Sequence, residues 1–292
     1  MPKKLRLILN PIAGGGRALK ILPRVKGILE SRGFHVEVFR TQRRGDAQEV
    51  ARVQKGEYSA VVAMGGDGTF NEVMNGALGS EVPLGLIPLG TANVLAKELR
   101  IPIDFVQASY VIAKGNTRWI DVGKTDHRHF TLMAGVGFDA EVVRRIESNR
   151  KGGISLVTYA LPILETFWSY GFPELMVEVD GKKVAEDAAL VFVSNSRRYT
   201  LTLRIAGRAR VDDGLLDVCI FQKRDRLNFL RYTAGAMFWL ADRFSDVIYL
   251  MGKDVRVSSP REVSYQIDGD LGGRLPARFQ VVPRALPVLV PA

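Results

Sequence analysis

The sequence predicts two domains of different class. The first is an α/β domain with a parallel sheet and helices on both faces, and the second is mainly antiparallel and β-sandwich-like, with inserted helices. Three observations indicate this. The 292 residues are more than one hydrophobic core usually holds. Strand and helix patterns alternate up to about residue 122. Beyond it, strand-like runs and turn pairs such as Asp180-Gly181 and Asp213-Gly214 dominate.

The first domain shows alternating strand and helix signals. The strand at 4–9 ends at Asn10-Pro11, Gly33 stops the first helix, and Asp46 is placed to cap the second. The segment 35–40 alternates polar and apolar residues, as a half-buried strand does. We expect strands at 4–9, 35–40, 59–64 and 84–88, and helices at 18–31, 46–54, 70–78, 91–99 and 105–114.

The second domain reads as a series of short strands with two long helices. We expect the strands at 129–133, 175–179, 188–194, 201–205, 215–221, 255–258, 263–267 and 277–282. The helices are expected at 154–170 and 227–249. Pro162 predicts a kink or break in the first of them.

Composition narrows the class of protein. The content of 47% hydrophobic and 25% charged residues is that of a soluble globular protein. The single cysteine, Cys219, rules out an internal disulfide framework and lies in an apolar run, so we expect it in the core. The N-terminus is too short and charged for a signal peptide, and no stretch reaches the roughly 18 clean apolar residues of a membrane span.

The net charge of +10 bears on partners. Such a balance suits nucleic acid, anionic lipid or polyphosphate, and it also suits a surface that simply favours solubility. No zinc-finger spacing, RNA-recognition signature or basic helix array accompanies it, so we expect no nucleic-acid partner.

The most informative segment is Gly65-Gly66-Asp67-Gly68-Thr69, which follows an apolar strand and precedes a helix. Glycines allow positive φ and leave amide groups uncovered, and amides at a helix N-terminus bind phosphate oxygens. The Asp67 carboxylate would repel a phosphate alone, whereas a divalent cation between them would resolve the conflict. An ordinary glycine-rich turn is the plainer alternative.

Three more loops follow strand ends of the same predicted sheet. They are residues 10–16, Thr41, and the segment from Gly90 to Asn93. Ligands of parallel sheets bind beyond the carboxyl ends of the strands. Four such loops at matching positions predict a binding site along one rim.

Seven motifs span nearly the whole chain: NPIAGG at 10–15, Thr41 with GDA at 45–47, GGDGT at 65–69 with Asn71-Glu72, PLGTANVLAKEL at 88–99, GVGFDA at 135–140, DDGLLDV at 212–218 and IDGD at 267–270. Together they resemble the diacylglycerol kinase catalytic family. The size and layout resemble its soluble bacterial lipid kinases, which are relatives of sphingosine and ceramide kinases.

The resemblance implies a nucleotide-binding domain at 1–122 that the C-terminal segment 283–292 rejoins, and a lipid domain at 123–282. It also implies ATP-dependent phosphorylation of a lipid hydroxyl, with Mg²⁺. By motif position, the residues expected to bind ATP are Asn10, Pro11, Ala13, Gly14, Thr41, Gly66, Asp67, Gly68, Thr69, Asn71 and Thr91. Asp67 would hold the catalytic Mg²⁺ directly or through water. Glu72 suits either an outer carboxylate or a helix first-turn charge.

The IDGD segment supplies the expected catalytic carboxylates of the second domain. One of Asp268 and Asp270 can accompany Mg²⁺, and the resemblance makes Asp270 the general base for the lipid hydroxyl. The family commonly has Glu there, so Asp270 is one methylene shorter. A turn in which Asp and Gly serve geometry alone is the alternative.

The DDGLLDV segment resembles the family's structural-magnesium loop. The implied ligands are the carboxylate of Asp213 and the carbonyls of Arg210 and Leu215, and a hairpin turn that needs no ion is the alternative. Asp121 and Asp139 also lie at family positions, which we assign to an interdomain hinge and a cleft wall.

The loop after Ser194-Asn195 departs from the family pattern, because the usual glycine cluster and proline are missing from 197–208. The basic residues Arg197, Arg198, Arg204, Arg208 and Arg210 cluster there. The segments 156–168 and 229–240 are apolar enough either to cover the sheet or to form an acyl groove. We therefore expect a cytoplasmic enzyme peripheral to an anionic membrane, with a homodimer as a further possibility.

Two other functions compete with an ATP-dependent lipid kinase. A NAD kinase shares the GGDGT loop and the nearby Asn-Glu pair, but the NPIAGG, DDGLLDV and IDGD segments speak against it. A catalytically degenerate lipid-binding protein is suggested by the shorter Asp270 and the altered 197–208 loop.

Overall fold

The computed structural model describes residues 3–148, 156–198 and 205–292, with the side chains of 156–160 also left undescribed. The chain divides into two compact units. The first comprises Met1–Asp121 and Arg284–Ala292, and the second comprises Val122–Pro283.

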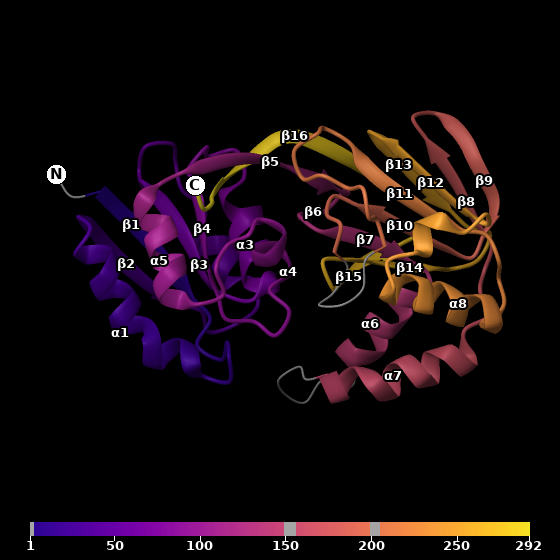
Figure 1. Ribbon diagram of the computed structural model, residues 1–292, viewed down its shortest axis with the longest axis horizontal. Helices are drawn as coiled ribbons and strands as arrows, with labels where there is room; N and C mark the ends of the chain where they lie inside the picture. Colours follow the sequence, from indigo (N-terminus) through magenta and orange to yellow (C-terminus); the bar gives the residue numbers. More distant parts are fainter. Residues whose placement is uncertain (1–2, 149–155, 199–204) are drawn as a thin grey trace. The chain divides into compact units, whose positions relative to one another are not determined.

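The first unit is built on four parallel strands in the order β2-β1-β3-β4 (Figure 1). The strands are β1 Lys3–Leu9, β2 Phe34–Arg40, β3 Ala60–Gly65 and β4 Leu84–Pro88. The helices are α1 Arg17–Glu30, α2 Asp46–Val50, α3 Asp67–Ala77, α4 Val94–Glu98 and α5 Phe105–Lys114. The C-terminal part of β16 (Ala277–Leu289) adds a further parallel pairing, Val288 with Leu84.

This strand order explains why both faces of the sheet are covered. The chain moves one way from β1 to β2 and the other way from β2 through β3 to β4. Because such crossovers are right-handed, α1 covers one face and α2 and α3 cover the other. Accordingly α1 packs with α5, and α2 packs with α3. The α/β class expected from the sequence is confirmed.

The expected capping role of Asp46 is wrong. Gly45, in the left-handed conformation, precedes α2, and Asp46 is the first helical residue. The Asp46 carboxylate instead accepts hydrogen bonds from the backbone amides of Gln42 (2.7 Å) and Arg43 (2.9 Å). It thereby fixes the loop that follows Thr41, and the two amide bonds lower the pKa of Asp46.

The second unit is a β-sandwich with helices on one outer face. One sheet is antiparallel in the order β12-β11-β10-β7-β14-β15. Its strands are β7 Met133–Val136, β10 Leu190–Ser194, β11 Leu216–Phe221, β12 Val247–Gly252, β14 Ser264–Ile267 and β15 Asp270–Arg274. Against it lie β8 Leu175–Val179, β9 Lys182–Ala188, β13 Asp254–Ser258 and the first residues of β16. The hairpin of β5 Thr117–Lys124 and β6 His129–Phe130 leads into this unit.

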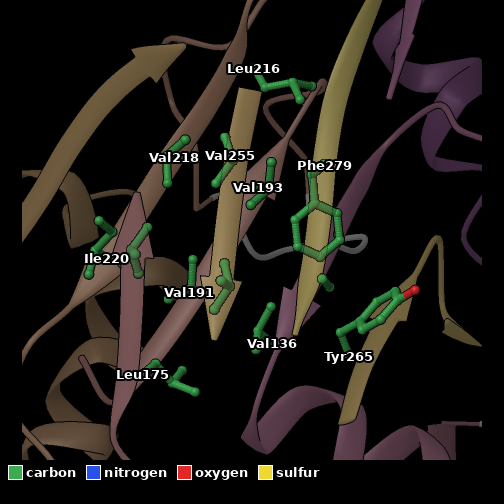
Figure 2. Packing of buried hydrophobic residues seen from close by; sticks show 14 of the residues in the cluster. Val136, Leu175, Val191, Val193, Leu216, Val218, Ile220, Val255, Tyr265 and Phe279 are labelled. Carbon is green, nitrogen blue, oxygen red and sulfur yellow. The ribbon is translucent and has the colours of Figure 1, made fainter. Parts of the chain in front are cut away.

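The core of the sandwich is formed by inward-facing aliphatic side chains of both sheets. Val191, Val218 and Ile220 face Val255 and Phe279, and all five are fully buried (Figure 2). The opposite face of the β11 sheet packs against α6 Phe138–Ser148 and α8 Arg226–Met237, and buried Cys219 lies in that layer, as expected. The sandwich-like class with inserted helices is confirmed.

The second expected long helix, 227–249, is wrong in its C-terminal half. The helix α8 ends at Met237, a 3₁₀ turn covers Ala241–Arg243, and β12 begins at Val247. The amide of Leu240 donates to the carbonyl of Gly235 (2.7 Å) across left-handed Trp239. A residue in the left-handed conformation commonly ends a helix in this way.

The first expected long helix, 154–170, agrees closely with the observed helix. The helix α7 spans Leu156–Ser169 and continues through Pro162, so a break at Pro162 is ruled out and a kink there stays a prediction. Most of the expected strand at 201–205 lies outside the described residues, and Ile205 itself is in a bend.

Two helical glycines give a matched test of the packing in the first unit. A Cβ on Gly76 of α3 would lie 2.1 Å from the carbonyl oxygen of Gln48, whereas one on Gly27 of α1 would meet nothing within 4 Å. We predict that Gly76→Ala destabilises the protein by about 1–3 kcal/mol. Gly27→Ala should stabilise it by about 0.5–1 kcal/mol. Urea unfolding of both variants measures this, and equal effects would contradict the close contact of α2 and α3.

Candidate functional site

The four parallel strands of the first unit end in register. Leu9 pairs with Arg40 on one side and Met64 on the other, and Met64 pairs with Ile87. The residues that follow these strands therefore lie along one edge of the sheet, as the sequence predicts. They include Asn10, Thr41 and the GGDGT loop.

The loop after β1 is tied to the GGDGT loop by Asn10. Its Nδ2 donates to the hydroxyl of Thr69 (3.3 Å), and its backbone amide donates to the carbonyl of Met64 (3.1 Å). The Thr69 side chain is buried and folds back over Gly65, where a Cβ would lie 2.4 Å from the Thr69 hydroxyl oxygen. In this structure Asn10 and Thr69 hold the two loops to each other.

The GGDGT loop also packs backbone to backbone on the loop after β4. A Cβ on Gly90 would lie 2.6 Å from the Cα of Gly66, so neither loop tolerates a side chain at that contact. Asn93 closes the second loop around Gly90. Its Oδ1 accepts from the Gly90 amide and its Nδ2 donates to the Gly90 carbonyl, each at 2.8 Å. The sequence motif contains Asn93, but its role came to light only in the structure.

Asp67 lies where two helices begin. It is the first residue of α3, and its Oδ1 accepts a hydrogen bond from the amide of Leu95 (3.1 Å) in the first turn of α4. Burial raises the pKa of Asp67, and hydrogen bonds from the amides of Leu95 and Val94 oppose that rise only in part. A largely desolvated carboxylate of this kind gains from a bound cation, so the residue fits the Mg²⁺ role expected of it.

The remaining residues expected to bind ATP differ in what they present. Thr91, Gly14 and Gly68 are exposed, and Pro11 and Thr41 are half-buried. The amide of Thr41 donates to the carbonyl of Leu9 (2.9 Å), which fixes it at the rim. By contrast, the side chains of Ala13 and Asn71 are buried, and the Asn71 amide oxygen accepts from Asn75 (3.1 Å). Glu72 lies in α3, directly after Asn71.

In the second unit the IDGD segment forms a tight hairpin. Ile267 pairs with Asp270, and the two residues between them, Asp268 and Gly269, both have positive φ. This is the geometry of an Asp-Gly type I′ turn. The Asp268 carboxylate accepts the backbone amides of Thr131 (2.8 Å), Leu132 (2.9 Å) and Met133 (3.1 Å). It therefore anchors the segment between β6 and β7 to the hairpin.

Asp270 has a different partner from Asp268. Its Oδ2 lies 3.2 Å from an Arg128 guanidinium nitrogen, and both side chains remain partly exposed. Sequence reasoning missed Arg128, because no motif connects the β5–β6 turn with a residue 142 positions later. Asp270 is thus a carboxylate held at the start of β15 and open to solvent on one side.

Asp139, in the first turn of α6, supports the same hairpin through the side chain of Gln266. Its carboxylate accepts from the Gln266 side chain (2.7 Å), whose oxygen in turn accepts from the amide of Gly269 (2.8 Å). Gly135 makes room for it, since a Cβ there would lie 2.2 Å from an Asp139 carboxylate oxygen.

Asp121, expected at a hinge, is fully buried at the last residue of the first unit before the chain passes into the second. Its carboxylate accepts the amide of Arg284 (2.7 Å), where the chain re-enters that unit.

The DDGLLDV segment begins with a turn in which the Asp213 carboxylate accepts the Leu215 amide (3.2 Å) and Gly214 has positive φ. Within residues 3–148, 156–198 and 205–292 there is no group of three or more His, Cys, Asp or Glu side chains that could hold a metal ion. The expected ligands are one carboxylate, that of Asp213, and the backbone carbonyls of Arg210 and Leu215. A site of this kind needs no group of three side chains, so it stays a prediction.

The structure describes only part of the loop at 197–208, which differs from the family pattern. The Arg197 guanidinium donates to the carbonyl of Ala209 (3.1 Å), and the amide of Arg208 donates to the Tyr249 hydroxyl (3.2 Å). Arg204 lies outside the described residues. None of the helices in the described ranges has the length and apolar character needed to cross a membrane.

The chain was compared with known families and proteins. Residues 4–125 match the diacylglycerol kinase catalytic domain, and residues 133–290 match the YegS C-terminal NAD kinase beta sandwich-like domain. Diacylglycerol kinases of Staphylococcus aureus (strain bovine RF122 / ET3-1) and Staphylococcus carnosus (strain TM300) are each 31% identical over the whole of this chain. The matches cover 93% and 96% of those proteins.

Solved structures show the same fold. A crystal structure of a diacylglycerol kinase from Bacillus anthracis str. Sterne aligns with a TM-score of 0.77 at 22% identity, covering 99% of this chain and 97% of that one. A second structure from the same strain, provisionally assigned as a diacylglycerol kinase, aligns with a TM-score of 0.82 at 23% identity, covering 99% and 96%.

The family matches and the full-length similarity to curated relatives agree with the motifs of both units. The chain belongs to the diacylglycerol kinase family and is an ATP-dependent lipid kinase.

Proposed function

We propose that the protein transfers the γ-phosphoryl group of ATP to the hydroxyl of diacylglycerol or a closely related long-chain lipid. The observation that carries this proposal is the rim of the parallel sheet, where a largely desolvated carboxylate, Asp67, lies among glycine loops at two helix N-termini. The names of the curated relatives favour diacylglycerol as the acceptor.

Each part of the reaction has a candidate residue. Amides of the glycine loops at 14–16 and 66–69 would bind phosphate oxygens, as amides at helix N-termini do. Asp67 would hold Mg²⁺, which when bound neutralises charge on the transferring phosphoryl group. The lipid hydroxyl oxygen forms a bond to the γ-phosphorus, the bond to the β-phosphate oxygen breaks, and ADP leaves. Asp270 would accept the hydroxyl proton.

The contacts of the two hairpin carboxylates favour a division of labour. Asp268 receives three backbone amides, so we assign it to holding the hairpin in shape rather than to Mg²⁺. Asp270 is partly exposed and its charge is balanced by Arg128, so it suits a base that must meet substrate. Three further expectations remain predictions: a structural Mg²⁺ at the loop around Asp213, peripheral association with an anionic membrane in the cytoplasm, and a homodimer.

A direct test measures ATP-dependent labelling of a lipid panel. We expect labelled phosphatidic acid from diacylglycerol with wild type in Mg²⁺, and at least a hundredfold less with Asp67→Asn or Asp270→Asn. Both variants should unfold at the wild-type temperature. Asp268→Asn, by contrast, should lower the free energy of unfolding by about 1–3 kcal/mol, because the amide nitrogen that replaces one carboxylate oxygen would face backbone N–H donors.

Two further measurements, an assay of NAD phosphorylation and a lipid-binding assay, separate the alternatives. Formation of NADP from NAD would favour a NAD kinase, and tight lipid binding with no ATP turnover would favour a degenerate protein. Full activity of Asp67→Asn would remove Asp67 from the mechanism.

Arg128 gives a second prediction about the base. If Arg128 orients the Asp270 carboxylate, Arg128→Gln should lower kcat roughly tenfold, the equivalent of about 1.5 kcal/mol for a charge-assisted hydrogen bond. The KM for ATP should stay unchanged, and Arg128→Lys should recover part of the rate. Steady-state kinetics measures this. Arg144→Gln, which breaks an exposed pair with Glu141 in the same unit, is the control. Equal effects of Arg128→Gln and the control would contradict the assignment.

A further inference from the structure

Helix α8 is apolar on two faces, although only one of them is covered. Tyr232 and Ala236 point into the core of the second unit and are buried. On the outer face, Leu227, Leu230 and Met237 are exposed, and Leu227 is 79% exposed. Together with exposed Ala234 these positions are spaced i, i+3, i+7 and i+10, which places them in one stripe along the helix.

The stripe continues into an apolar corner where α8 ends. Phe238 and Trp239 are 70% and 56% exposed, and Leu240 is also exposed. Three consecutive large apolar residues in solvent are costly unless something covers them. Aromatic residues at such a corner are typical of proteins that insert into the interface of a bilayer.

The first turn of α8 meets the last turn of α7. The Arg226 guanidinium donates to the carbonyls of Phe167 (3.2 Å) and Trp168 (2.7 Å). Trp168 is itself exposed, and with Leu161 and Leu164 it forms an i, i+3, i+7 stripe on α7. The two exposed stripes therefore belong to helices that are in contact where α7 ends and α8 begins, and Figure 1 shows the two helices as neighbours.

Charge around α8 is positive. Residues 223–246 contain five Lys or Arg and three Asp. Arg231 is paired with Asp246, and Arg224 is paired with Glu174 (3.1 Å) and Asp187 (2.7 Å). Asp225 caps α8 by accepting the Asn228 amide (2.9 Å), and Asp242 lies 3.8 Å from an Arg208 guanidinium nitrogen. The segment keeps an excess of positive charge, to which the exposed side chains of Lys223, Arg226 and Arg243 contribute.

We propose that the outer face of α8 with its corner, formed by Leu227, Leu230, Met237, Phe238, Trp239 and Leu240 and here called the α8 surface, docks on a leaflet that contains anionic phospholipid. The inference rests on the proposed function, since a lipid kinase must meet its substrate at a membrane. Apolar side chains bordered by Arg and Lys match a leaflet with an apolar interior and anionic head groups.

Charge complementarity selects this occupant over a second copy of the chain. Each copy carries a net charge of +10, so two α8 surfaces with basic borders would repel one another. An acyl groove is also disfavoured, because the stripe lies on the outward side of a single helix whose inner side is filled by core residues.

Vesicle binding tests the proposal with variants that keep the fold. Trp239→Asn suits the left-handed backbone at that position (φ 61°), and Leu230→Gln changes an exposed helical side chain. Each should weaken co-sedimentation with vesicles of phosphatidylcholine and phosphatidylglycerol by roughly tenfold. Arg243→Gln should weaken it by about fivefold and only when phosphatidylglycerol is present. Leu19→Gln on α1, a helical leucine that is 41% exposed, is the matched control.

Kinetics separates failure of this inference from failure of the proposed function. The α8 variants should keep wild-type turnover of a water-soluble short-chain diacylglycerol and lose turnover of the same lipid class in vesicles. Wild type that binds vesicles through the α8 surface but phosphorylates no lipid would defeat the proposed function and leave the docking surface standing. Vesicle binding unchanged in Trp239→Asn and Leu230→Gln, or loss of a dimer in these variants, would overturn the docking surface.

Discussion

The contact between two strand-end loops of the first unit determines the rest of the candidate site. Gly66 and Gly90 approach so closely that a side chain on either would collide with the other backbone. The contact is possible because β3 and β4 are parallel and end in register, Gly65 opposite Pro88. It brings the beginning of α3 next to the beginning of α4, and Asp67 is the residue that joins them.

That position explains why a carboxylate is useful there. Two helix N-termini favour negative charge, whereas burial disfavours it, and the net result is a raised pKa for Asp67. A cation would relieve the remaining cost, which is the physical basis of the proposal that Asp67 binds Mg²⁺. The hairpin of the second unit follows a similar plan. Asp268 and Asp139 fix its shape by hydrogen bonds, which leaves Asp270 at its edge.

The sequence predicted the features that depend on local pattern. Strand and helix alternation predicted the α/β class of the first unit, and strand-like runs with turn pairs predicted the class of the second. The positions of glycines after strands predicted the rim. Features that depend on contacts between distant residues were out of reach. The end of α8 follows from Gly235, which leaves room for the Phe244 ring, and from left-handed Trp239, and neither signal is visible in the apolar run 227–249. The amide contacts of Asp268 likewise join residues more than 130 positions apart.

The central claim is that the half-buried Asp67 carboxylate organises Mg²⁺ with the nucleotide. Proton-linked calorimetry tests it most directly, by measuring Mg²⁺-ADP binding in buffers of different ionisation enthalpy near pH 5, about one unit above the ordinary Asp value. A raised pKa predicts that wild type releases more protons on binding than Asp67→Asn does, and that the difference disappears at higher pH. Equal proton release by the two proteins, with equal affinity for Mg²⁺-ADP, would contradict the claim.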